Sequence, residues 1–403
     1  MHKPLEGIRI VEWGIFHAGP GGPAILCDMG AEVIKIEQPV LGDPVRGVSE
    51  FKNVDFNFGK GSNIFFEGAN RGKKSITIDL SQDEGRDIAY NLVKECDVFF
   101  TNIRPVTVKK MKMGYETLSK INPRLIYASV TGFGSRGPDA NCGGFDFQGQ
   151  GKAGLMFNIG EPNMDPMLAQ FGVADQATAI MASYQIVIAL LMRERLGISQ
   201  EVEVSLLSTV SYLMYFNNLT ALLKGVEVPR HERVSADPLR NYYKCKDEKW
   251  IILTDSPNSD HWEVICKILG HSDMAENARF DNREKRMQNS RELVAVFDKA
   301  FKTKARDAWL RLFTKKNIIV CAVNTTMDVI NDPQMTANDY IVDYDHPELG
   351  QIRIPGFPIR FSNAEVNNNF VGPQLGEHTE SVLKEIGGYS DEDIEGFKKK
   401  KLL

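Results

Sequence analysis

The chain opens with a short apolar run, Ile8-Arg-Ile-Val-Glu12, and a glycine-rich segment, Gly14-Ile-Phe-His-Ala-Gly-Pro-Gly-Gly22. This order indicates a buried strand that turns into a helix, and backbone N–H groups at such a turn can bind anions. The segment does not match the dinucleotide fingerprint G-x-G-x-x-G at the required offset. Pro20 and Pro23 also differ from the usual dinucleotide turn. We therefore expect an α/β unit here, without a dinucleotide site.

Strand and helix signals continue to alternate along the first half of the chain. Residues 84–95 have a helical pattern, and short apolar runs lie on both sides of it. Such alternation predicts right-handed βαβ units and a mostly parallel sheet, so the expected fold class is α/β. Residues 202–206 form either a further strand or the start of a helix. The other predicted strands cover residues 33–36, 75–80, 97–101 and 125–130.

A second glycine-rich segment, Gly68-Ala-Asn-Arg-Gly-Lys-Lys-Ser75, differs from a phosphate-binding P-loop. A P-loop has four residues between its glycines and precedes a helix. Here three residues separate the glycines, and a predicted strand follows. We therefore reject a P-loop at this position.

Composition and length narrow the class of protein. The 403 residues include 48 Lys and Arg against 53 Asp and Glu, a net charge of −5, which argues against nucleic acid as a main partner. The six cysteines form no CxxC pair and are expected to be reduced. The first residues lack the apolar core of a signal peptide, and the longest apolar run, residues 180–192, is shorter than a membrane span. We expect a soluble, cytoplasmic protein with two domains.

The alternation of strand and helix patterns ends near residue 225. Residues 226–240 are polar and contain two prolines, as in a linker or an exposed loop. Two predicted strands at 241–245 and 250–254, joined by a turn, and several helical patterns then indicate a small α+β domain. Before this change, residues 176–195 predict a long helix that is apolar on most faces and therefore buried.

Metal sites and hydrolytic triads find no support. The seven histidines are dispersed, without HxH or HExxH, and no GxSxG segment occurs. We expect no metal.

Asp175 is the most suggestive single residue. It lies just ahead of the long apolar helix, in Phe171-Gly-Val-Ala-Asp175-Gln. From the residues alone, a helix N-cap is the favoured interpretation, because Asp is common there. The same position also allows a functional interpretation. The helix dipole would keep the carboxylate ionised, and an ionised carboxylate can act as a covalent nucleophile.

An ordered set of segments resembles the class III CoA-transferases, a family that includes formyl-CoA, carnitine and 2-hydroxyacyl CoA-transferases and racemase relatives. The resemblance runs nearly from end to end. Its segments include Leu5-Glu-Gly-Ile-Arg-Ile-Val-Glu12, Ala18-Gly-Pro20, Gly30-Ala-Glu-Val-Ile-Lys-Ile-Glu37, Gly42-Asp-Pro-Val-Arg-Gly47, Asn70-Arg-Gly-Lys-Lys-Ser75, Asn102-Ile-Arg-Pro105, Asn122-Pro-Arg-Leu-Ile-Tyr127, Thr131-Gly-Phe-Gly134, Ala174-Asp175 and Gly376-Glu-His-Thr-Glu380.

The resemblance implies a Rossmann-like large domain built from both chain ends, with an inserted small α+β domain. Together with the change in sequence pattern near residue 225, the resemblance predicts a large CoA-binding domain over residues 1–225 and a small domain over 226–334. Residues 335–403 are expected to return to the large domain. It also implies a dimer of two interlocked rings.

The resemblance further implies that Asp175 is catalytic. Its carboxylate would attack an acyl-CoA and form a mixed anhydride, and the released CoA thiolate would convert this into an aspartyl-CoA thioester. An acceptor carboxylate would then reverse the steps. The acceptor class suggested is an aromatic, branched or dicarboxylic acid.

Coenzyme A, as acyl-CoA substrate, would contact the loops that follow the strands. Relatives often carry Gln at the position of His17 and a basic residue at the position of Gln38. His17 and Gln38 therefore both differ from the family's usual residues. His17 is either a polar contact to the reacting carbonyl or simply a loop residue. The alternative for the basic residues in this set is that they are ordinary solvated surface charges instead of CoA contacts, since most Arg and Lys side chains are exposed. The expected CoA contacts are Phe16, His17, Ala18, Gln38, Arg71, Lys73, Lys74, Asn102, Ile103, Arg104 and Lys110.

Two alternatives remain open at this stage. An α-methylacyl-CoA racemase would share the Asp, but it pairs that residue with a His in Gly-His-Asp, and the matching segment here is Gly144-Phe145-Asp146. Phe145 cannot move a proton. The chain could also be one subunit of a heteromeric CoA-transferase instead of a homodimer.

Overall fold

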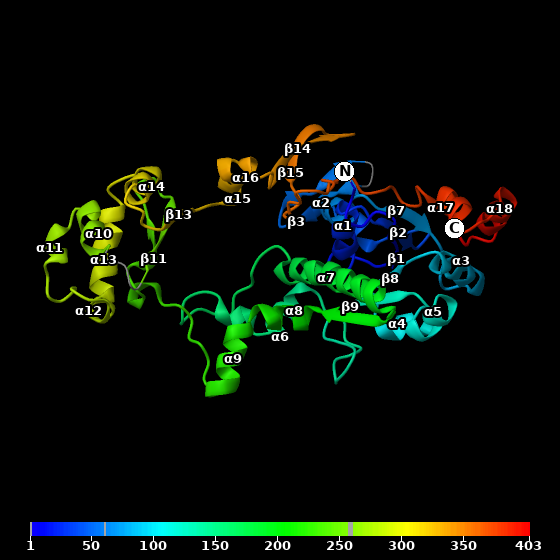
Figure 1. The fold of residues 1–403 in the computed structure, drawn as a ribbon, viewed down its shortest axis with the longest axis horizontal. Helices are drawn as coiled ribbons and strands as arrows, with labels where there is room; N and C mark the ends of the chain where they lie inside the picture. The colour runs from blue at the N-terminus through cyan, green and yellow to red at the C-terminus, as the bar shows by residue number, and fades with distance from the viewer. Residues whose placement is uncertain (1, 60–61, 257–260) are drawn as a thin grey trace. The chain divides into compact units, whose positions relative to one another are not determined.

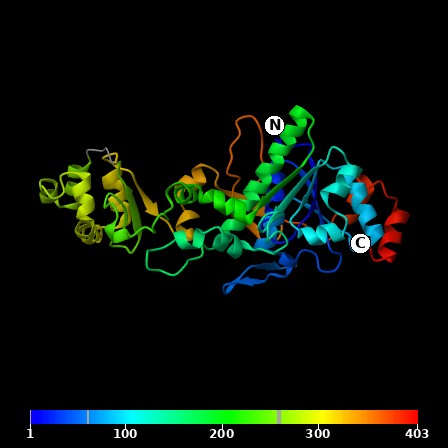
Figure 2. The same cartoon turned by 90° about the horizontal axis from the view of Figure 1, so that it is seen from below.

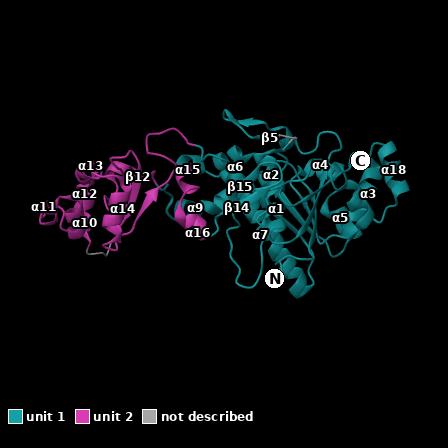
Figure 3. Cartoon of the chain, turned by 90° about the horizontal axis from the view of Figure 1, so that it is seen from above, with its two compact units in different colours: residues 1–157, 168–228, 339–403 teal, residues 158–167, 229–338 magenta. Residues whose placement is uncertain are grey.

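The computed structural model describes residues 2–59, 62–256 and 261–403. By internal contacts the chain divides into two compact units, coloured separately in Figure 3. Unit 1 contains residues 1–157, 168–228 and 339–403, and unit 2 contains residues 158–167 and 229–338. The domain limits expected from the sequence, 1–225, 226–334 and 335–403, stay a prediction.

Unit 1 is built on a six-stranded sheet in the order β10-β9-β8-β1-β2-β7, and all its pairs are parallel (Figure 1). The predicted parallel sheet is therefore confirmed. The chain first builds outward from β1 to β2 and β7, and then returns to the other side of β1 with β8, β9 and β10. The strands are β1 Arg9–Trp13, β2 Glu32–Glu37, β7 Lys74–Thr77, β8 Val98–Thr101, β9 Ile126–Thr131 and β10 Glu201–Ser205.

The central strands are buried on both faces, which explains why the sequence shows continuous apolar runs. Alternate residues of one strand enter different cores: Val98 and Phe100 face one side of the sheet, and Phe99 faces the other. Residues 202–206, predicted as either strand or helix, contain both in succession, because α8 (Leu206–Leu213) begins directly after β10.

Helices α1 (Gly21–Asp28) and α7 (Val173–Leu196) lie against one face of the sheet (Figure 2). They approach each other closely through small residues. A Cβ atom on Gly22 would lie 2.8 Å from Cβ of Ala182, and one on Gly21 would lie 2.9 Å from Cβ of Ala179. Larger side chains at these glycines would force the two helices apart.

The expectation that the long helix is buried, because it is apolar on most faces, is wrong for its outer face. Its outer face leaves Ile180 54%, Tyr184 58% and Leu191 48% exposed in this single chain. By length and composition alone α7 could cross a membrane, and 44% of the relevant window is buried inside the protein. An apolar helix of this kind is weak support for membrane insertion.

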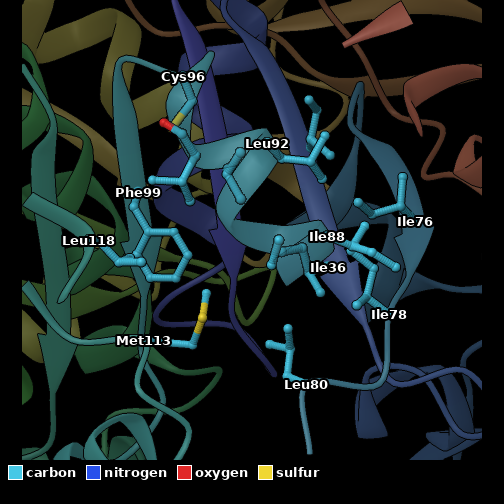
Figure 4. Packing of buried hydrophobic residues seen from close by; sticks show 14 of the residues in the cluster. Ile36, Ile76, Ile78, Leu80, Ile88, Leu92, Cys96, Phe99, Met113 and Leu118 are labelled. Atoms are coloured by element: carbon cyan, nitrogen blue, oxygen red, sulfur yellow. The ribbon is translucent and has the colours of Figure 1, made fainter. Parts of the chain in front are cut away.

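The opposite face of the sheet is covered by helices from distant parts of the chain. Helices α3 (Asp83–Lys94) and α5 (Tyr115–Ile121) share this core with α17 (Thr379–Glu385) and α18 (Asp391–Lys399). Figure 4 shows the packing around Ile88 and Leu92 of α3 against strand residues such as Ile36 and Phe99. The C-terminal segment therefore completes the core of unit 1.

The remaining elements of unit 1 are short. The helices are α2 Ile64–Asn70, α4 Pro105–Lys110, α6 Asp146–Lys152, α8 Leu206–Leu213 and α9 Tyr215–Lys224, with 3-10 turns η1 Pro44–Gly47 and η2 Leu155–Asn158. Three two-stranded pairs are formed by β3 Glu50–Phe51 with β4 Val54–Asp55, β5 Asn57–Gly59 with β6 Ser62–Asn63, and β14 Ile341–His346 with β15 Gly350–Pro355.

Unit 2 is an α+β unit with its own core. Strand β12 (Trp250–Thr254) pairs antiparallel with both β11 (Arg240–Lys244) and β13 (Val320–Val323), so the predicted hairpin is confirmed. The core is rich in aromatic residues, among them Tyr243, Phe297 and Trp309. The helices are α10 Trp262–Leu269, α11 Ser272–Ala275, α12 Arg283–Gln288, α13 Ser290–Phe301, α14 Arg306–Thr314, α15 Thr326–Val329 and α16 Pro333–Ala337, with η3 Arg233–Ser235.

Candidate functional site

A cavity of about 410 Å³ lies in unit 1 beside the ends of β1 and β8. The order of the strands reverses between these two neighbours, so the loops that follow them diverge and leave a crevice, the usual ligand position in open α/β sheets. The lining residues are Ile15, Phe16, Ala18, Asn102, Ile103, Arg104, Pro105, Thr107, Val130, Thr131, Gly132, Ala140, Cys142, Gly143, Gly144, Phe145, Asp175 and Leu206. Of the residues predicted to form the site, six meet here: Phe16, Ala18, Asn102, Ile103, Arg104 and Asp175.

Asp175 lies in the first turn of α7, and it does not cap this helix. The helix begins at Val173, after Phe171 and Gly172, whose φ values of 59° and 64° are both left-handed. The N–H groups of Ala174 and Asp175 donate instead to Oδ2 of Asp146, at 2.7 and 3.1 Å. The N-cap interpretation of Asp175 is therefore wrong, because Asp146 already takes these donors.

The Asp175 carboxylate itself accepts no hydrogen bond from any residue in the described ranges 2–59, 62–256 and 261–403. It is partly buried and lines the cavity. Burial, and then the negative charge of Asp146, raise the pKa of Asp175 to about 7. This result differs from the expectation that the helix dipole keeps the group ionised, because both effects disfavour the charged form.

The loop after β1 is held from two sides. The N–H of Phe16, a residue with φ 61°, donates to Oδ1 of Asp43 at 3.0 Å. Asn102, which follows β8, bonds both the N–H and the carbonyl of Ile15. The Phe16 ring meets the Phe145 ring edge to face at 5.6 Å, and Phe145 is 61% exposed. These contacts give the cavity an apolar wall and a fixed backbone.

His17 lies on the other side of this loop. Its Nε2 is 2.6 Å from Oε1 of Gln176, the neighbour of Asp175. It lines a second cavity of about 570 Å³ in unit 1, with Arg71, Tyr184 and Phe357 among the other lining residues. Burial lowers the pKa of His17, so its neutral form is favoured near pH 7. His17 thus lines the second cavity, whereas six other predicted site residues line the first.

Arg104 is the cation of the first cavity. It is exposed, and among the described residues its guanidinium has no carboxylate partner. The backbone of Gly143 lies directly against it: a Cβ atom on Gly143 would lie 2.8 Å from Nη2 of Arg104. An unpaired guanidinium in a crevice suits an anionic ligand.

The other basic residues predicted to contact the ligand already have protein partners. Arg71 pairs with Asp28 at 2.7 Å, Lys73 with buried Glu12 at 2.6 Å, and Lys74 with Glu32 at 2.7 Å. The Gln38 side chain accepts from the N–H groups of Val40 and Leu41 within its own loop. Lys110 is exposed in the last turn of α4 and does not line the cavity. The structure does not bring these five residues to the first cavity.

A buried charge network beneath the loop was not predicted from the sequence. Nζ of Lys35 lies 3.0 Å from Oε1 of Glu12 and 2.9 Å from Oδ2 of Asp43, and all three side chains are fully buried. Burial alone lowers the pKa of Lys35, but Asp43 and Glu12 reverse this effect and hold it above its usual value. The available signal was a lysine inside the apolar strand Glu32–Glu37.

In the part of the chain that the structure describes, no group of three or more His, Cys, Asp or Glu side chains is arranged to hold a metal ion.

Comparisons with known proteins agree with one another. The family model for CoA-transferase family III matches residues 5–379. Succinyl-CoA:glutarate CoA-transferase of Mus musculus is 32% identical over 395 residues, covering 98% of this chain and 88% of that protein. (R)-2-hydroxy-4-methylpentanoate CoA-transferase of Clostridioides difficile is 30% identical over 403 residues, covering 99% of each. The crystal structure of a CAIB/BAIF family protein from Brucella suis matches with a TM-score of 0.85 and 32% identity, covering 96% of this chain and 100% of that one. The chain therefore belongs to CoA-transferase family III and is an enzyme of this class.

Proposed function

We propose that this enzyme moves CoA from an acyl-CoA donor to a free carboxylic acid, with Asp175 as the covalent carrier. The observation that carries the proposal is the Asp175 carboxylate, which faces a cavity without a hydrogen-bond partner in the described chain while Asp146 caps its helix. A carboxylate free of such bonds keeps its lone pairs available for attack.

The proposed steps balance without any added reagent. The Asp175 carboxylate attacks the thioester carbonyl, and the C–S bond breaks to release CoA thiolate and a mixed anhydride. The thiolate attacks the aspartyl carbonyl, which forms the aspartyl-CoA thioester and releases the donor acid. The acceptor carboxylate then attacks this thioester, and its C–S bond breaks to give a second mixed anhydride and CoA thiolate. The thiolate attacks the acceptor's carbonyl in this anhydride, which forms the new acyl-CoA and frees the Asp175 carboxylate. The thioester energy is conserved only if water is excluded during these steps.

Arg104 is the proposed anchor for a CoA phosphate, and Phe16, Ala18, Asn102 and Ile103 are proposed to line the path of the cofactor. Their common position around one cavity supports this assignment. His17 is proposed to lie beside this path, where it contacts the Gln176 side chain. CoA contacts of Gln38, Arg71, Lys73, Lys74 and Lys110 stay predictions, since these side chains are engaged elsewhere or lie outside the cavity.

For the acceptor we propose a dicarboxylic, branched or aromatic acid. The two relatives named above act, by their names, on glutarate and on a branched 2-hydroxy acid. The aromatic pair Phe16 and Phe145 would suit an apolar substituent of the acceptor. Offering succinyl-CoA with glutarate, 2-hydroxy-4-methylpentanoate or a phenyl-substituted acid, and measuring the new acyl-CoA, distinguishes the three classes.

The test of the mechanism is intact-protein mass spectrometry after mixing with succinyl-CoA, with hydroxylamine or borohydride trapping. We expect a CoA-sized adduct, or a trapped derivative, that maps to Asp175. Asp175→Asn should abolish it, whereas Asp87→Ala, which removes an exposed carboxylate on α3, should leave it unchanged. Adduct formation in Asp175→Asn would overturn the covalent role.

A racemase remains the alternative on this fold, with Asp175 as a base. Phe145 lines the cavity at the position where the racemase segment carries its His, which disfavours this function. We expect no exchange of the α-proton of a 2-methylacyl-CoA in deuterated water. Rapid exchange without transfer would instead support the racemase.

We also propose that the enzyme is a cytoplasmic homodimer with the interlocked arrangement of the family, or one subunit of a heteromer. Large exposed apolar side chains on α8 and α9 support an oligomer: Tyr212 is 70%, Phe216 79% and Leu222 83% exposed in the single chain. Light scattering measures the mass of the purified chain. Transfer by this chain alone would remove the need for a second kind of subunit.

A further inference from the structure

We infer that Asp146 is a positioning residue of the transfer reaction, which caps α7 in place of Asp175 and leaves the Asp175 carboxylate free to attack. The inference rests on the proposed function. It adds a second acidic residue to the site, from a different element and 29 positions away in the sequence.

The geometry assigns the capping role to one oxygen. Oδ2 of Asp146 accepts from the N–H groups of Ala174 and Asp175, the second and third residues of α7. These are the donors that a capping side chain usually takes. Because both are engaged, the Asp175 side chain has no local hydrogen bond to make at its own helix terminus. It stays directed to the cavity that it lines.

The other oxygen of Asp146 is held by Gln150, one turn further along α6. Nε2 of Gln150 donates to Oδ1 of Asp146 at 2.5 Å, and the same amide exchanges two hydrogen bonds with the backbone of Ala169 at 2.9 and 3.0 Å. Asp146 is 6% exposed and Gln150 is fully buried. The carboxylate therefore has a single orientation, and Gln150 ties it to the segment that leads into α7.

The charge of Asp146 serves the chemistry as well as the geometry. A neighbouring negative charge disfavours the free Asp175 carboxylate relative to its acylated forms, which are neutral. It also makes the carboxylate more basic, and hence a stronger nucleophile. Both effects lower the barrier between the free enzyme and the covalent intermediate.

Among the charged groups on the elements around Asp175, Asp146 is the one that shifts the pKa of its carboxyl group. The α6 helix contributes Asp146, and the loops that line the cavity contribute Arg104 and Cys142. The loop after β1 contributes His17, whose neutral form is favoured, while Leu206 of α8 carries no charge. Burial and Asp146 together raise the pKa of Asp175 to about 7.

The test is Asp146→Asn, which removes the charge and keeps one acceptor oxygen for the two N–H groups, while the bond from Gln150 Nε2 is lost. The rate of CoA adduct formation with succinyl-CoA is measured in single turnovers from pH 5 to 9. In the unaltered enzyme the rate should rise with a midpoint near pH 7. In Asp146→Asn the midpoint should fall by about one pH unit, so the rate at pH 5.5 relative to pH 8.5 should rise about eightfold.

A matched control is Asp393→Asn, the same change in the first turn of α18, where the carboxylate accepts from the N–H of Ser390 at 2.9 Å. Its midpoint should not move. A merely structural role of Asp146 would lower the rate and the melting temperature without moving the midpoint, and that result would overturn the inference while the proposed function stands. Absence of an adduct in the unaltered enzyme would instead contradict the proposed function itself.

A second variant covers the case in which Asp146→Asn does not fold. Gln150→Met keeps the approximate volume of the side chain and removes its hydrogen bonds to Asp146 and Ala169. We expect slower adduct formation, by about tenfold, with unchanged KM for the acyl-CoA. An unchanged rate would contradict a positioning role for this pair.

Discussion

Asn102 holds the backbone of Ile15 from both sides: the Ile15 N–H donates to Oδ1 at 2.9 Å, and Nδ2 donates to the Ile15 carbonyl at 2.9 Å. Ile15 follows β1 and Asn102 follows β8, so the two bonds cross the point where the strand order reverses. They join the two loops that border the candidate active site. Gly19 also packs here, since a Cβ atom on it would lie 2.4 Å from Cγ of Asn102.

We expect Asn102→Leu to lower kcat/KM for acyl-CoA by about tenfold or more, because a misplaced loop no longer orients the substrate. Two unpaired backbone groups should also cost about 1–3 kcal/mol of stability. The control is Asn122→Leu, because Nδ2 of Asn122 donates to two carbonyls, Val93 and Cys96, and this residue does not line the cavity. It should lose similar stability in urea and retain activity. Equal losses of activity in both variants would contradict a specific role for Asn102.

Gly143→Ala should displace Arg104, because the added Cβ would lie 2.8 Å from its Nη2. The guanidinium is at the end of a flexible side chain, so we expect it to move while the fold is retained. KM for the acyl-CoA should rise about tenfold, the loss expected for one charge-assisted contact, with little change in melting temperature. Gly396→Ala, in open space on α18, is the control and should leave steady-state kinetics unchanged. An unchanged KM in Gly143→Ala would argue against Arg104 as a substrate anchor.

Lys35→Met should destabilise the protein strongly. It would leave the buried carboxylate of Asp43 without a cation, while Glu12 keeps Lys73, and the expected loss is about 3–5 kcal/mol. Lys74→Met removes a lysine whose partner Glu32 is about 30% exposed, and it should cost about 1 kcal/mol or less. Urea denaturation followed by circular dichroism measures both. Similar small losses would show that the Lys35 network contributes little to stability.

Asp175→Asn should stabilise the protein more at pH 8 than at pH 5. The folded pKa of about 7 lies above the ordinary value of 3.8, so the folded protein holds this proton more tightly. The contribution of Asp175 to stability is therefore complete below about pH 4 and is lost as the pH rises through 7. We expect the variant to gain roughly 2–4 °C in melting temperature at pH 8. The same gain at pH 5 and pH 8 would contradict the raised pKa.

Local patterns were sufficient for much of unit 1. The apolar runs predicted β1, β2, β8 and β9 to within one or two residues, because strands buried on both faces are apolar throughout. They were insufficient for α7. Its outer face is apolar and exposed in the single chain, with Ile180 and Tyr184 among its residues, and composition alone cannot separate such a face from a buried one.

The sequence by itself determined the parallel α/β sheet, the hairpin of unit 2 and the position of Asp175 at the start of a long helix. These features depend on the periodicity of neighbouring residues, which is local. Only the tertiary structure decided which carboxylate caps that helix. The capping oxygen belongs to Asp146, 28 residues before Ala174, and the loop after β1 is held by Asn102, 87 residues after Ile15. Such bonds require atoms within about 3 Å of each other, and only the packing of the sheet and its helices brings residues so distant in sequence to that range.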